Sequence, residues 1–475
     1  MTPHAYNMRL ARIVLSVATI VFLGGSFSEE VLSQIGRSVA RDPGVRTSSA
    51  SACPGGAQPP CMLEGLTAVE QQAFKVGQDA FEEVESVQGT VPDTDDGLGP
   101  RFNLDSCAGC HAFPAIGGSS PFLNPQIEVA KKEGASNDIP PFITADGPIR
   151  EARFKYNPDG TPDGGVHALF TISGRSDAAG CVLQQPDFRT ALASKNVIFR
   201  IPTPTFGAGL IEAIDDKAIL ANLNTNLGTK QTLGIHGKPN RPTTGGHTNN
   251  SGNDGTITRF GHKAQNKSLE IFAAEAYNVE QGITNDMFPQ ERDETAGCRF
   301  NPTPESTTKF DAATPLDAPS DVVKFAVFMR FLAPPPPAPN IDTMGQKLFG
   351  DVGCAMCHTP TLYTGEKNAV AALQNKPVNL YSDLAVHNMG AGLADDVSQG
   401  LAGGDEFRTA PLWGLGQRVF FLHDGRTKDL REAIQAHVGP GSKNYPPSEA
   451  NQVVAKFNRL TEMEKQHILN FLRGL

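Results

Sequence analysis

Apolar positions recur at helical spacing near both ends of the body of the chain. Between residues 68 and 87 they fit one face of an amphipathic helix. The same spacing predicts a helix over 344–352 and a closing helix over 462–472. Thr461, followed three residues later by Glu464, gives the closing helix a capping box. The apolar positions of the first and last of these helices are Phe74, Val76, Ala80, Phe81 and Val84, and Met463, Ile468, Phe471 and Leu472.

The region between these helices, from 114 to 331, shows a different pattern. Short apolar and β-branched runs at 167–172, 196–201 and 209–214 suggest strands or buried segments, and turn residues separate them. The chain contains 48 glycines and 36 prolines, and only 19% of its residues are charged, which favours irregular structure. We therefore expect a mainly α, loop-rich protein in which a long irregular insertion carries short strands.

The chain of 475 residues is long enough for two or more domains. The run Ala333-Pro-Pro-Pro-Pro-Ala-Pro339 cannot be helical and should form a stiff, extended connector. We place a domain boundary inside it, between a region over 66–332 and a C-terminal domain over 340–475. A segment rich in Ser, Gly and Pro over 28–65 is expected to be a tether.

Residues 1–27 have the pattern of an export signal, because Arg9 and Arg12 precede an apolar run over 13–23 and small residues follow. This run is short for a membrane span, although the lack of an Ala-x-Ala site leaves an uncleaved anchor as the alternative. Removal of the signal changes the formal charge from −10 to −12. We expect a periplasmic protein with no stable membrane span. Its acidity argues against nucleic acid and favours a basic redox partner.

Two short motifs match the pattern for covalent attachment of a c-type haem. Two thiols separated by two residues on a turn can each add to one vinyl group of the porphyrin. The next residue then presents an imidazole to the iron. The motifs are Cys107-Ala-Gly-Cys110-His111 and Cys354-Ala-Met-Cys357-His358.

Two other interpretations of these cysteines are a redox dithiol and a zinc site of four thiolates built from both pairs. A redox dithiol does not require a histidine directly after the second cysteine, and coincidence is unlikely to produce the complete motif twice. The sequence therefore predicts two haem c groups with His111 and His358 as proximal iron ligands.

Four cysteines remain, and an even number in an oxidising compartment suggests disulfides. Three pairings are possible. We favour Cys53 with Cys61, which are close in sequence, and hence Cys181 with Cys298. The alternative is that some of these residues are free buried thiols.

A set of further motifs accompanies the haem motifs. They are Gly97-Leu-Gly-Pro-Arg-Phe-Asn103, Ser106-Cys-Ala-Gly-Cys-His111, Asp163-Gly-Gly-Val-His167, Arg200-Ile-Pro-Thr-Pro-Thr-Phe-Gly-Ala-Gly-Leu-Ile-Glu212, Gly282-Ile-Thr-Asn285, Tyr381-Ser-Asp-Leu384, His387-Asn-Met-Gly390, Thr409-Ala-Pro-Leu-Trp413 and His423-Asp-Gly-Arg426. From about Leu66 to Leu475 the chain resembles the bacterial di-haem oxidoreductases described as peroxidases or thiol oxidoreductases.

The resemblance implies two cytochrome c-like haem domains and a distant relation to the di-haem cytochrome c peroxidases. It also implies a relation to di-haem enzymes that modify proteins. The C-terminal half matches better, since a haem motif, a methionine and a His-Asp-Gly segment follow in the same order. One departure is that His437 is commonly followed by Gly-Gly-Glu in this family, whereas Val438-Gly439-Pro440 stands here. Any role of that glutamate is therefore in doubt.

The second axial ligands differ in how well the sequence defines them. Met389 follows His358 in a Gly-rich segment, at the position where the resemblance implies a ligand. A thioether ligand raises the reduction potential of a haem, which suits an electron relay. His387 is the alternative ligand, and Met389 as ordinary core filler is the alternative role.

For the N-terminal haem, no His or Met follows His111 until His167, so proximity assigns no distal ligand. Arg150 and Glu151 could supply a distal cation and an acid/base group, although a surface ion pair is slightly favoured. The histidine candidates are His167, His236, His247 and His262.

These observations predict an exported di-haem c-type oxidoreductase. Its C-terminal haem would accept electrons from a small redox protein, and its N-terminal haem would reduce hydrogen peroxide or a similar oxidant. Breaking an O–O bond at iron needs a vacant iron position and a distal group that moves a proton. The alternatives are a non-catalytic electron-transfer cytochrome with two six-coordinate irons, and an oxidase acting on an organic or protein substrate.

Overall fold

A computed structural model of the chain describes residues 39–46, 53, 59–241 and 257–475. The expected export signal lies outside these residues. Within them, no helix is long and apolar enough to cross a membrane. Contacts join Ala40–Leu475 into one unit, in which the regions on both sides of the expected boundary pack together. The segment 333–338 contains no helix or strand, as its prolines require.

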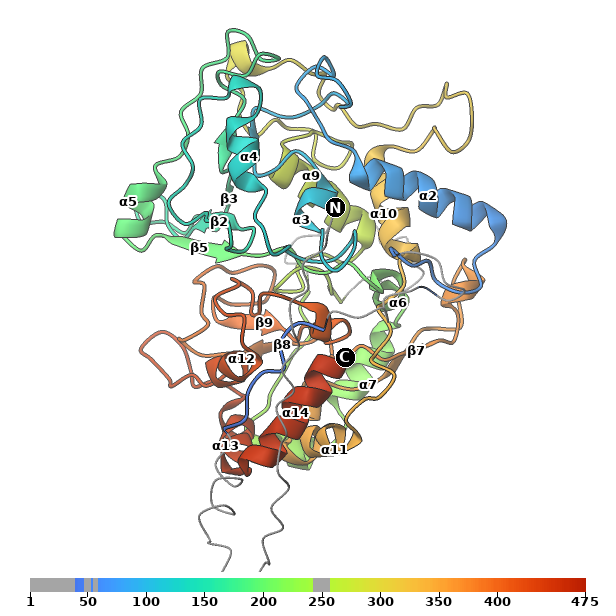
Figure 1. The fold of residues 1–475 in the computed structure, drawn as a ribbon, viewed down its shortest axis with the longest axis vertical. Helices are drawn as coiled ribbons and strands as arrows, with labels where there is room; N and C mark the ends of the chain where they lie inside the picture. Colours follow the sequence, from blue (N-terminus) through green and yellow to red (C-terminus); the bar gives the residue numbers. More distant parts are fainter. Residues whose placement is uncertain (1–38, 47–52, 54–58, 242–256) are drawn as a thin grey trace, which may run out of the picture. The chain divides into compact units, whose positions relative to one another are not determined.

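Helices provide most of the regular structure, and short strands and loops connect them (Figure 1). The helices are α2 (Ala68–Glu82), α3 (Cys107–Cys110), α4 (Gln126–Lys131), α5 (Phe188–Ala193), α6 (Ala208–Glu212), α7 (Asp216–Leu223), α8 (Leu227–Leu233), α9 (Leu269–Gln281), α10 (Asp321–Phe331), α11 (Thr343–Val352), α12 (Leu430–Ala436), α13 (Asn451–Arg459) and α14 (Glu462–Gly474). The mainly helical, loop-rich character that we expected is thus present.

The strands are two to four residues long and form small antiparallel sheets. They are β1 (Arg101–Phe102), β2 (Glu151–Phe154), β3 (Val166–His167), β4 (Phe170–Thr171), β5 (Val197–Arg200), β6 (Leu362–Tyr363), β7 (Pro377–Val378), β8 (Val386–Asn388) and β9 (Glu406–Arg408). The sheets have the strand orders β1-β4, β3-β2-β5, β6-β7 and β8-β9.

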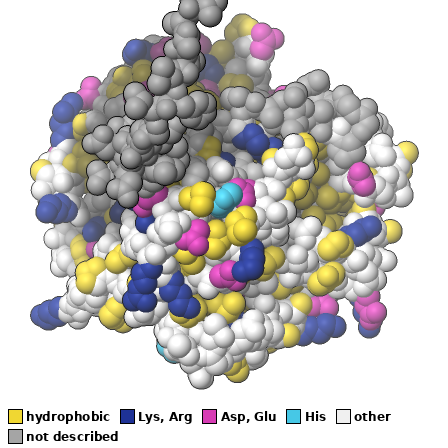
Figure 2. Space-filling view, turned by 60° about the horizontal axis from the view of Figure 1, so that its bottom comes forward, with side chains coloured by type: hydrophobic (Ala, Val, Ile, Leu, Met, Phe, Trp, Pro, Cys, Tyr) yellow, Lys and Arg dark blue, Asp and Glu magenta, His cyan; other side chains and the backbone are white. Residues whose placement is uncertain are grey.

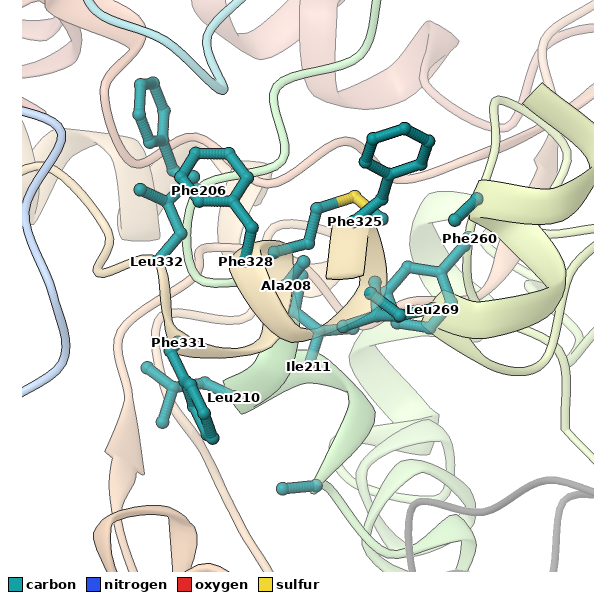
Figure 3. Packing of buried hydrophobic residues seen from close by; sticks show 14 of the residues in the cluster. Phe206, Ala208, Leu210, Ile211, Phe260, Leu269, Phe325, Phe328, Phe331 and Leu332 are labelled. Atoms are coloured by element: carbon teal, nitrogen blue, oxygen red, sulfur yellow. The ribbon is translucent and has the colours of Figure 1, made fainter. Parts of the chain in front are cut away.

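The largest apolar core lies where α2, α6, α9 and α10 meet, and Figure 3 shows part of it. Phe328 of α10 contacts two rings of α2, with centroid distances of 5.2 Å to Phe74 and 4.8 Å to Phe81. Gly77 allows this approach, since a Cβ there would lie 2.5 Å from the carbonyl oxygen of Lys324. The predicted helix over 68–87 is therefore present as α2, although it ends at Glu82.

A second core joins α11, α13 and α14. The rings of Phe349 and Phe471 lie 5.4 Å apart between α11 and α14. The predicted capping box is confirmed, because the Thr461 hydroxyl accepts from the Glu464 N–H and the Glu464 carboxylate accepts from the Thr461 N–H. Met463, expected on the apolar face, is 72% exposed. It lies in the first turn of α14.

The central region contains more helix than we expected. Of the three expected runs, the one over 167–172 contains strand β4 and the end of β3, and the one over 196–201 contains β5. The run over 209–214 lies in and after helix α6. All residues of α6 are buried, so its apolar run reflects a helix enclosed on every side. Gly207 begins this helix with a φ of +66°, and a Cβ there would lie 2.5 Å from the ring of Trp413.

Both favoured disulfides are present, between Cys53 and Cys61 and between Cys181 and Cys298. Part of the segment that we expected to be a tether is fixed in place. Asp42 forms a two-point ion pair with Arg473 of α14, at distances of 2.6 and 2.7 Å. On the face shown in Figure 2, acidic and basic side chains of the described residues are interspersed among apolar ones.

Candidate functional site

The two Cys-x-x-Cys-His motifs fold into matching turns. The N-terminal motif occupies α3 and the C-terminal one a 3₁₀ turn after α11. In both, the backbone N–H of the histidine donates to the carbonyl of the first cysteine, at 3.0 Å from His111 to Cys107 and 2.9 Å from His358 to Cys354. The same local geometry therefore presents two thiols and an imidazole at two places in the chain.

Each histidine of these motifs is fixed through one ring nitrogen. The Nδ1 atom of His111 lies 2.9 Å from the Gly118 carbonyl, and that of His358 lies 3.0 Å from the Tyr381 carbonyl. A carbonyl accepts only from N–H, so this contact places the proton on Nδ1 and would let Nε2 bind iron. The ring of His111 also has a hydrogen bond to the backbone of Thr203. Burial lowers the pKa of both rings, that of His358 to about 4, which keeps them neutral.

The cysteines of the motifs have the properties of buried thiols. They are not joined in disulfides, and burial raises the pKa of Cys107, Cys110 and Cys354, the last to about 12. A redox dithiol or a zinc site requires thiolates, which these surroundings disfavour. The two pairs also line different cavities, so they do not meet in one four-thiolate site.

The first cavity, called cavity N here, contains Cys107, Cys110 and His111. Its walls come from α9 and from strands β2 and β5. The second, cavity C, contains Cys354, Cys357 and His358. They enclose about 1120 and about 2070 Å³ of empty space, including parts open to solvent. Apolar side chains surround the motif residues in both cavities, as they would around an apolar macrocycle such as haem.

A pair of carboxyl groups faces cavity N. Glu151 of β2 is hydrogen-bonded to Glu280 of α9, and Asn103 donates to Glu280 at 2.8 Å. Burial and the charge of Glu151 raise the pKa of Glu280 well above its ordinary value. Burial alone would raise the pKa of Glu151, but Arg153 at 2.5 Å and Arg200 lower it to about 2. The pair therefore favours a single proton that is carried by Glu280.

Arg150 and Glu151 do not form the surface ion pair that the sequence slightly favoured. Both line cavity N, and Glu151 pairs with Arg153 instead. The Arg150 guanidinium lies 4.9 Å from the centre of the Phe199 ring and donates to the carbonyl of Asp424. Side chains alternate between the two faces of a strand, so residues 151 and 153 of β2 point to the same face. This explains why Glu151 pairs with Arg153 and not with Arg150.

The histidine candidates for cavity N differ in position. His167 stacks on Phe154 and its Nε2 contacts Asp163, and the side chain of His236 is exposed; neither lines the cavity. His247 lies outside the described residues. His262 lines both cavities, and its Nε2 lies 2.9 Å from the Ile201 carbonyl.

Met389 lines cavity C together with His358. It follows strand β8, which pairs with β9 in the register Val386 to Arg408 and Asn388 to Glu406. The backbone N–H of Met389 donates to the Asp405 carbonyl at 2.9 Å, which extends this hairpin. The hairpin therefore fixes the backbone that carries the thioether.

His387 is held by other groups. Its Nε2 lies 2.9 Å from Asp383 and its Nδ1 lies 2.8 Å from Glu449. With both nitrogens bound to carboxylates, this ring has no free lone pair for a metal. Glu449 also accepts from the Asn388 N–H, so it supports β8 in a chain that lacks the glutamate expected after His437.

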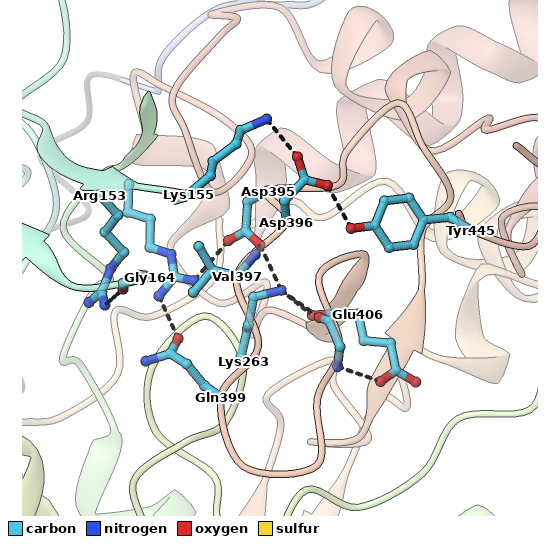
Figure 4. Close-up of polar contacts among 12 residues, drawn as sticks. Arg153, Lys155, Gly164, Lys263, Asp395, Asp396, Val397, Gln399, Glu406 and Tyr445 are labelled. Atoms are coloured by element: carbon cyan, nitrogen blue, oxygen red, sulfur yellow. Dashed lines mark hydrogen bonds and ion pairs between the residues drawn. The ribbon is translucent and has the colours of Figure 1, made fainter. Parts of the chain in front are cut away.

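Cavities N and C adjoin each other. They share lining residues, namely Thr203, Thr205, Gly261, His262 and Phe272. A buried polar network also connects their walls (Figure 4). Arg200 of cavity N pairs with Asp395 at 2.8 Å, and Asp395 pairs with Lys263 at 3.0 Å. The Lys263 ammonium donates to the Glu406 carbonyl and lies 4.0 Å from the centre of the Phe407 ring of cavity C.

Sequence reasoning missed Glu280, Arg153 and Arg200 as parts of this site. Glu280 is the penultimate residue of a helix that the sequence pattern did not reveal. Glu151 and Arg200 are directly opposite each other in the pairing of β2 with β5. No local motif connects these residues, because their proximity arises only from the tertiary fold.

Two solved structures resemble parts of this chain weakly. One is hydrazine synthase of Kuenenia stuttgartiensis, with 19% identity, 34% of this chain covered and a TM-score of 0.23. This chain spans only 56% of that protein's chain. The other is a MauG-like protein associated with microbial copper homeostasis, with 15% identity and a TM-score of 0.26. The matched part covers 55% of this chain and 89% of the chain of that protein. We draw no conclusion from either likeness.

No curated protein matches the sequence. A family model described as "Di-haem oxidoreductase, putative peroxidase" matches residues 150–475. The match includes the C-terminal haem motif and begins after the N-terminal one. Because it covers more than half of the chain, the protein belongs to this family of di-haem oxidoreductases.

Proposed function

We propose that the protein is an exported di-haem c-type oxidoreductase that reduces hydrogen peroxide. Cys107 and Cys110 attach one haem in region 66–332, and Cys354 and Cys357 attach the other in domain 340–475. Membership of the di-haem family and the two matching motif turns support this assignment. When bound, the haems would supply redox-active iron, and the N-terminal one would be the centre at which peroxide reacts.

The observation that carries the proposal is the Glu151–Glu280 pair beside the N-terminal motif. Reduction of hydrogen peroxide takes two electrons and two protons and yields two waters. The pair holds one proton on Glu280 and one acceptor on Glu151. It can therefore take a proton from one oxygen of the substrate and deliver a proton to the other, which leaves as water. Arg153 keeps Glu151 ionised between turnovers.

The C-terminal centre serves as the electron entry. His358 and Met389 line the same cavity and would be the residues that hold its iron. His387 is not a candidate ligand, because Asp383 and Glu449 occupy its nitrogens. A small basic redox protein is the donor that the negative charge of the chain would attract. Electrons would cross the wall that contains His262 and Thr203.

Replacement of Glu280 by Gln tests the proton-transfer role. Loss of a positioned acid/base group lowers turnover by roughly 10²–10⁴-fold, so the Glu280→Gln variant should lose that much peroxide turnover. Turnover is measured with a reduced small cytochrome as donor, and both haems should remain attached. Glu270→Gln, near the other end of α9 and away from cavity N, is the control and should retain the wild-type rate. A wild-type rate in Glu280→Gln would contradict the role.

Replacement of Met389 by Ala tests the electron entry. The variant should lose any near-infrared sulfur-to-iron band and show a lower potential for one haem, while both haems stay attached. Met344→Ala is the control, since Met344 is 52% exposed and lies outside cavity C. Unchanged potentials and spectra in Met389→Ala would show that the thioether is not a ligand.

A further inference from the structure

Cavity C contains two arginines without an acidic partner among the described residues. Arg408 ends β9, and Arg418 follows the 3₁₀ turn over Leu415–Gln417. Neither forms an ion pair within the part of the chain that the structure describes. The fully buried Arg175, by contrast, pairs with Asp177 at 2.8 Å.

The two guanidinium groups are also short of hydrogen-bond acceptors. Arg408 donates from Nε to the Gly261 carbonyl at 3.0 Å, whereas the buried Nε of Arg418 has no partner among the described residues. Burial lowers the pKa of both to about 10, and for Arg408 the charge of Arg418 adds to this effect. Both remain charged at neutral pH. A buried charge without a counter-charge is unfavourable. An anion with two negative charges would therefore stabilise these two arginines.

The rest of the cavity lining offers no such anion. Among the described lining residues, Arg408 and Arg418 are the only Arg or Lys. Glu449 is the only carboxylate among the described residues of the lining, and His387 already binds it. Within the part of the chain that the structure describes, the charge that would balance Arg408 and Arg418 is left to a molecule that enters cavity C.

We propose that Arg408 and Arg418 bind the two propionate carboxylates of the haem attached at Cys354 and Cys357. This inference rests on the proposed two-haem function. A haem carries two carboxylates, and a guanidinium is the side chain best suited to a carboxylate. Register supports the arrangement, since Arg408 pairs with Val386, three residues before Met389. At roughly 3.3 Å per residue, Arg408 is offset by about 10 Å from Met389 along the hairpin, so the two side chains would hold different parts of a group as large as haem.

The test uses the haem-loaded protein and the variants Arg408→Gln and Arg418→Gln. Covalent attachment keeps both haems in place, so the pyridine spectrum of the denatured variants should still give two haems per chain. Removing a positive charge beside the propionates should lower the potential of one haem. It should also raise the pKa of the propionates, so that this potential becomes more pH-dependent than in the wild type. Arg459→Gln, at the exposed end of α13, controls for the change in net charge and should alter neither property.

A second variant keeps the test decisive if either glutamine variant fails to fold. Arg418→Lys retains the charge but not the planar fork. Its haem potential should shift less than that of Arg418→Gln. The propionate bending bands of its resonance Raman spectrum should nevertheless move. Unchanged potentials, pH profiles and Raman bands with two haems present would overturn the propionate assignment alone. Fewer than two haems in the wild type would instead overturn the proposed function.

A free anion is the other source of the same chemistry. Wild-type protein is therefore titrated with inorganic phosphate and with acetate while the spectrum of the C-terminal haem is followed. If propionates occupy Arg408 and Arg418, neither anion should produce a saturable change. A saturable change that disappears in Arg418→Gln would show that the site binds anions from solution and would contradict the proposal.

Discussion

Removal of the disulfide between Cys181 and Cys298 should destabilise the protein more than removal of the one between Cys53 and Cys61. In the chain-entropy model, a cross-link stabilises a fold by restricting the unfolded chain, and its effect grows with the logarithm of the loop length. The two disulfides close loops with sequence separations of 117 and 8 residues. The same relation gives about 5 kcal/mol for the first and about 2.5 kcal/mol for the second.

The structure gives the longer loop a second role. Cys181 and Cys298 belong to the apolar cluster that also contains Cys110 of the N-terminal haem motif. The double Cys→Ala change should therefore loosen the wall of cavity N as well as stabilise the unfolded chain. Peroxide turnover should fall further in this variant than in the one that lacks the Cys53–Cys61 bond.

The assay is urea unfolding followed by far-UV circular dichroism, at one pH and without reductant. The matched control is the double Cys→Ala change at Cys53 and Cys61. We expect the free energy of unfolding to fall by about 2.5 kcal/mol more in the Cys181/Cys298 variant than in this control. Equal losses, or a larger loss in the control, would refute the loop-length reasoning.

Three further predictions concern stability. Phe328 is fully buried in the core of α2 and α10, so Phe328→Ala should reduce the free energy of unfolding by roughly 3–5 kcal/mol. Phe310→Ala, at a side chain that is 97% exposed, should change it by less than about 0.5 kcal/mol; thermal melts of both variants check this. Burial and neighbouring acidic groups raise the pKa of Glu85 from 4.5 to about 9. The folded state thus retains a proton that the unfolded state has lost, and stability should fall as pH rises from about 5 to 9. Glu85→Gln should flatten this dependence, and urea midpoints with the same pH slope as wild type would contradict it. Arg473→Met leaves Asp42 buried and unpaired, and should cost about 3–5 kcal/mol in urea unfolding; a loss below about 1 kcal/mol would mean that the pair is solvated.

The features that the sequence predicted correctly depend on local patterns. The spacing of Phe74 and Phe81 on one face was enough to indicate α2, and Thr461 with Glu464 marked the start of α14. The disulfide between Cys53 and Cys61 follows from proximity in sequence. In each case the interacting residues are close along the chain, so their spacing carries the information.

The features that escaped sequence analysis depend on tertiary contacts. Helix α10 has apolar residues on several faces because other elements surround it, so no amphipathic period marks it. Glu151 could be recognised as a candidate, but its partner Glu280 comes from a helix far along the chain. Likewise, the lack of an acidic partner for Arg408 and Arg418 among the described residues can be recognised only once the lining of cavity C is known.

The most direct test of the central claim is a count of covalently bound haem. Purified protein is denatured, washed free of dissociable haem and examined in alkaline pyridine. The account predicts two c-type haems per chain, falling to one when Cys107 and Cys110 are replaced by Ala and the remaining haem is held by Cys354 and Cys357. One haem or none in the wild-type chain would contradict it.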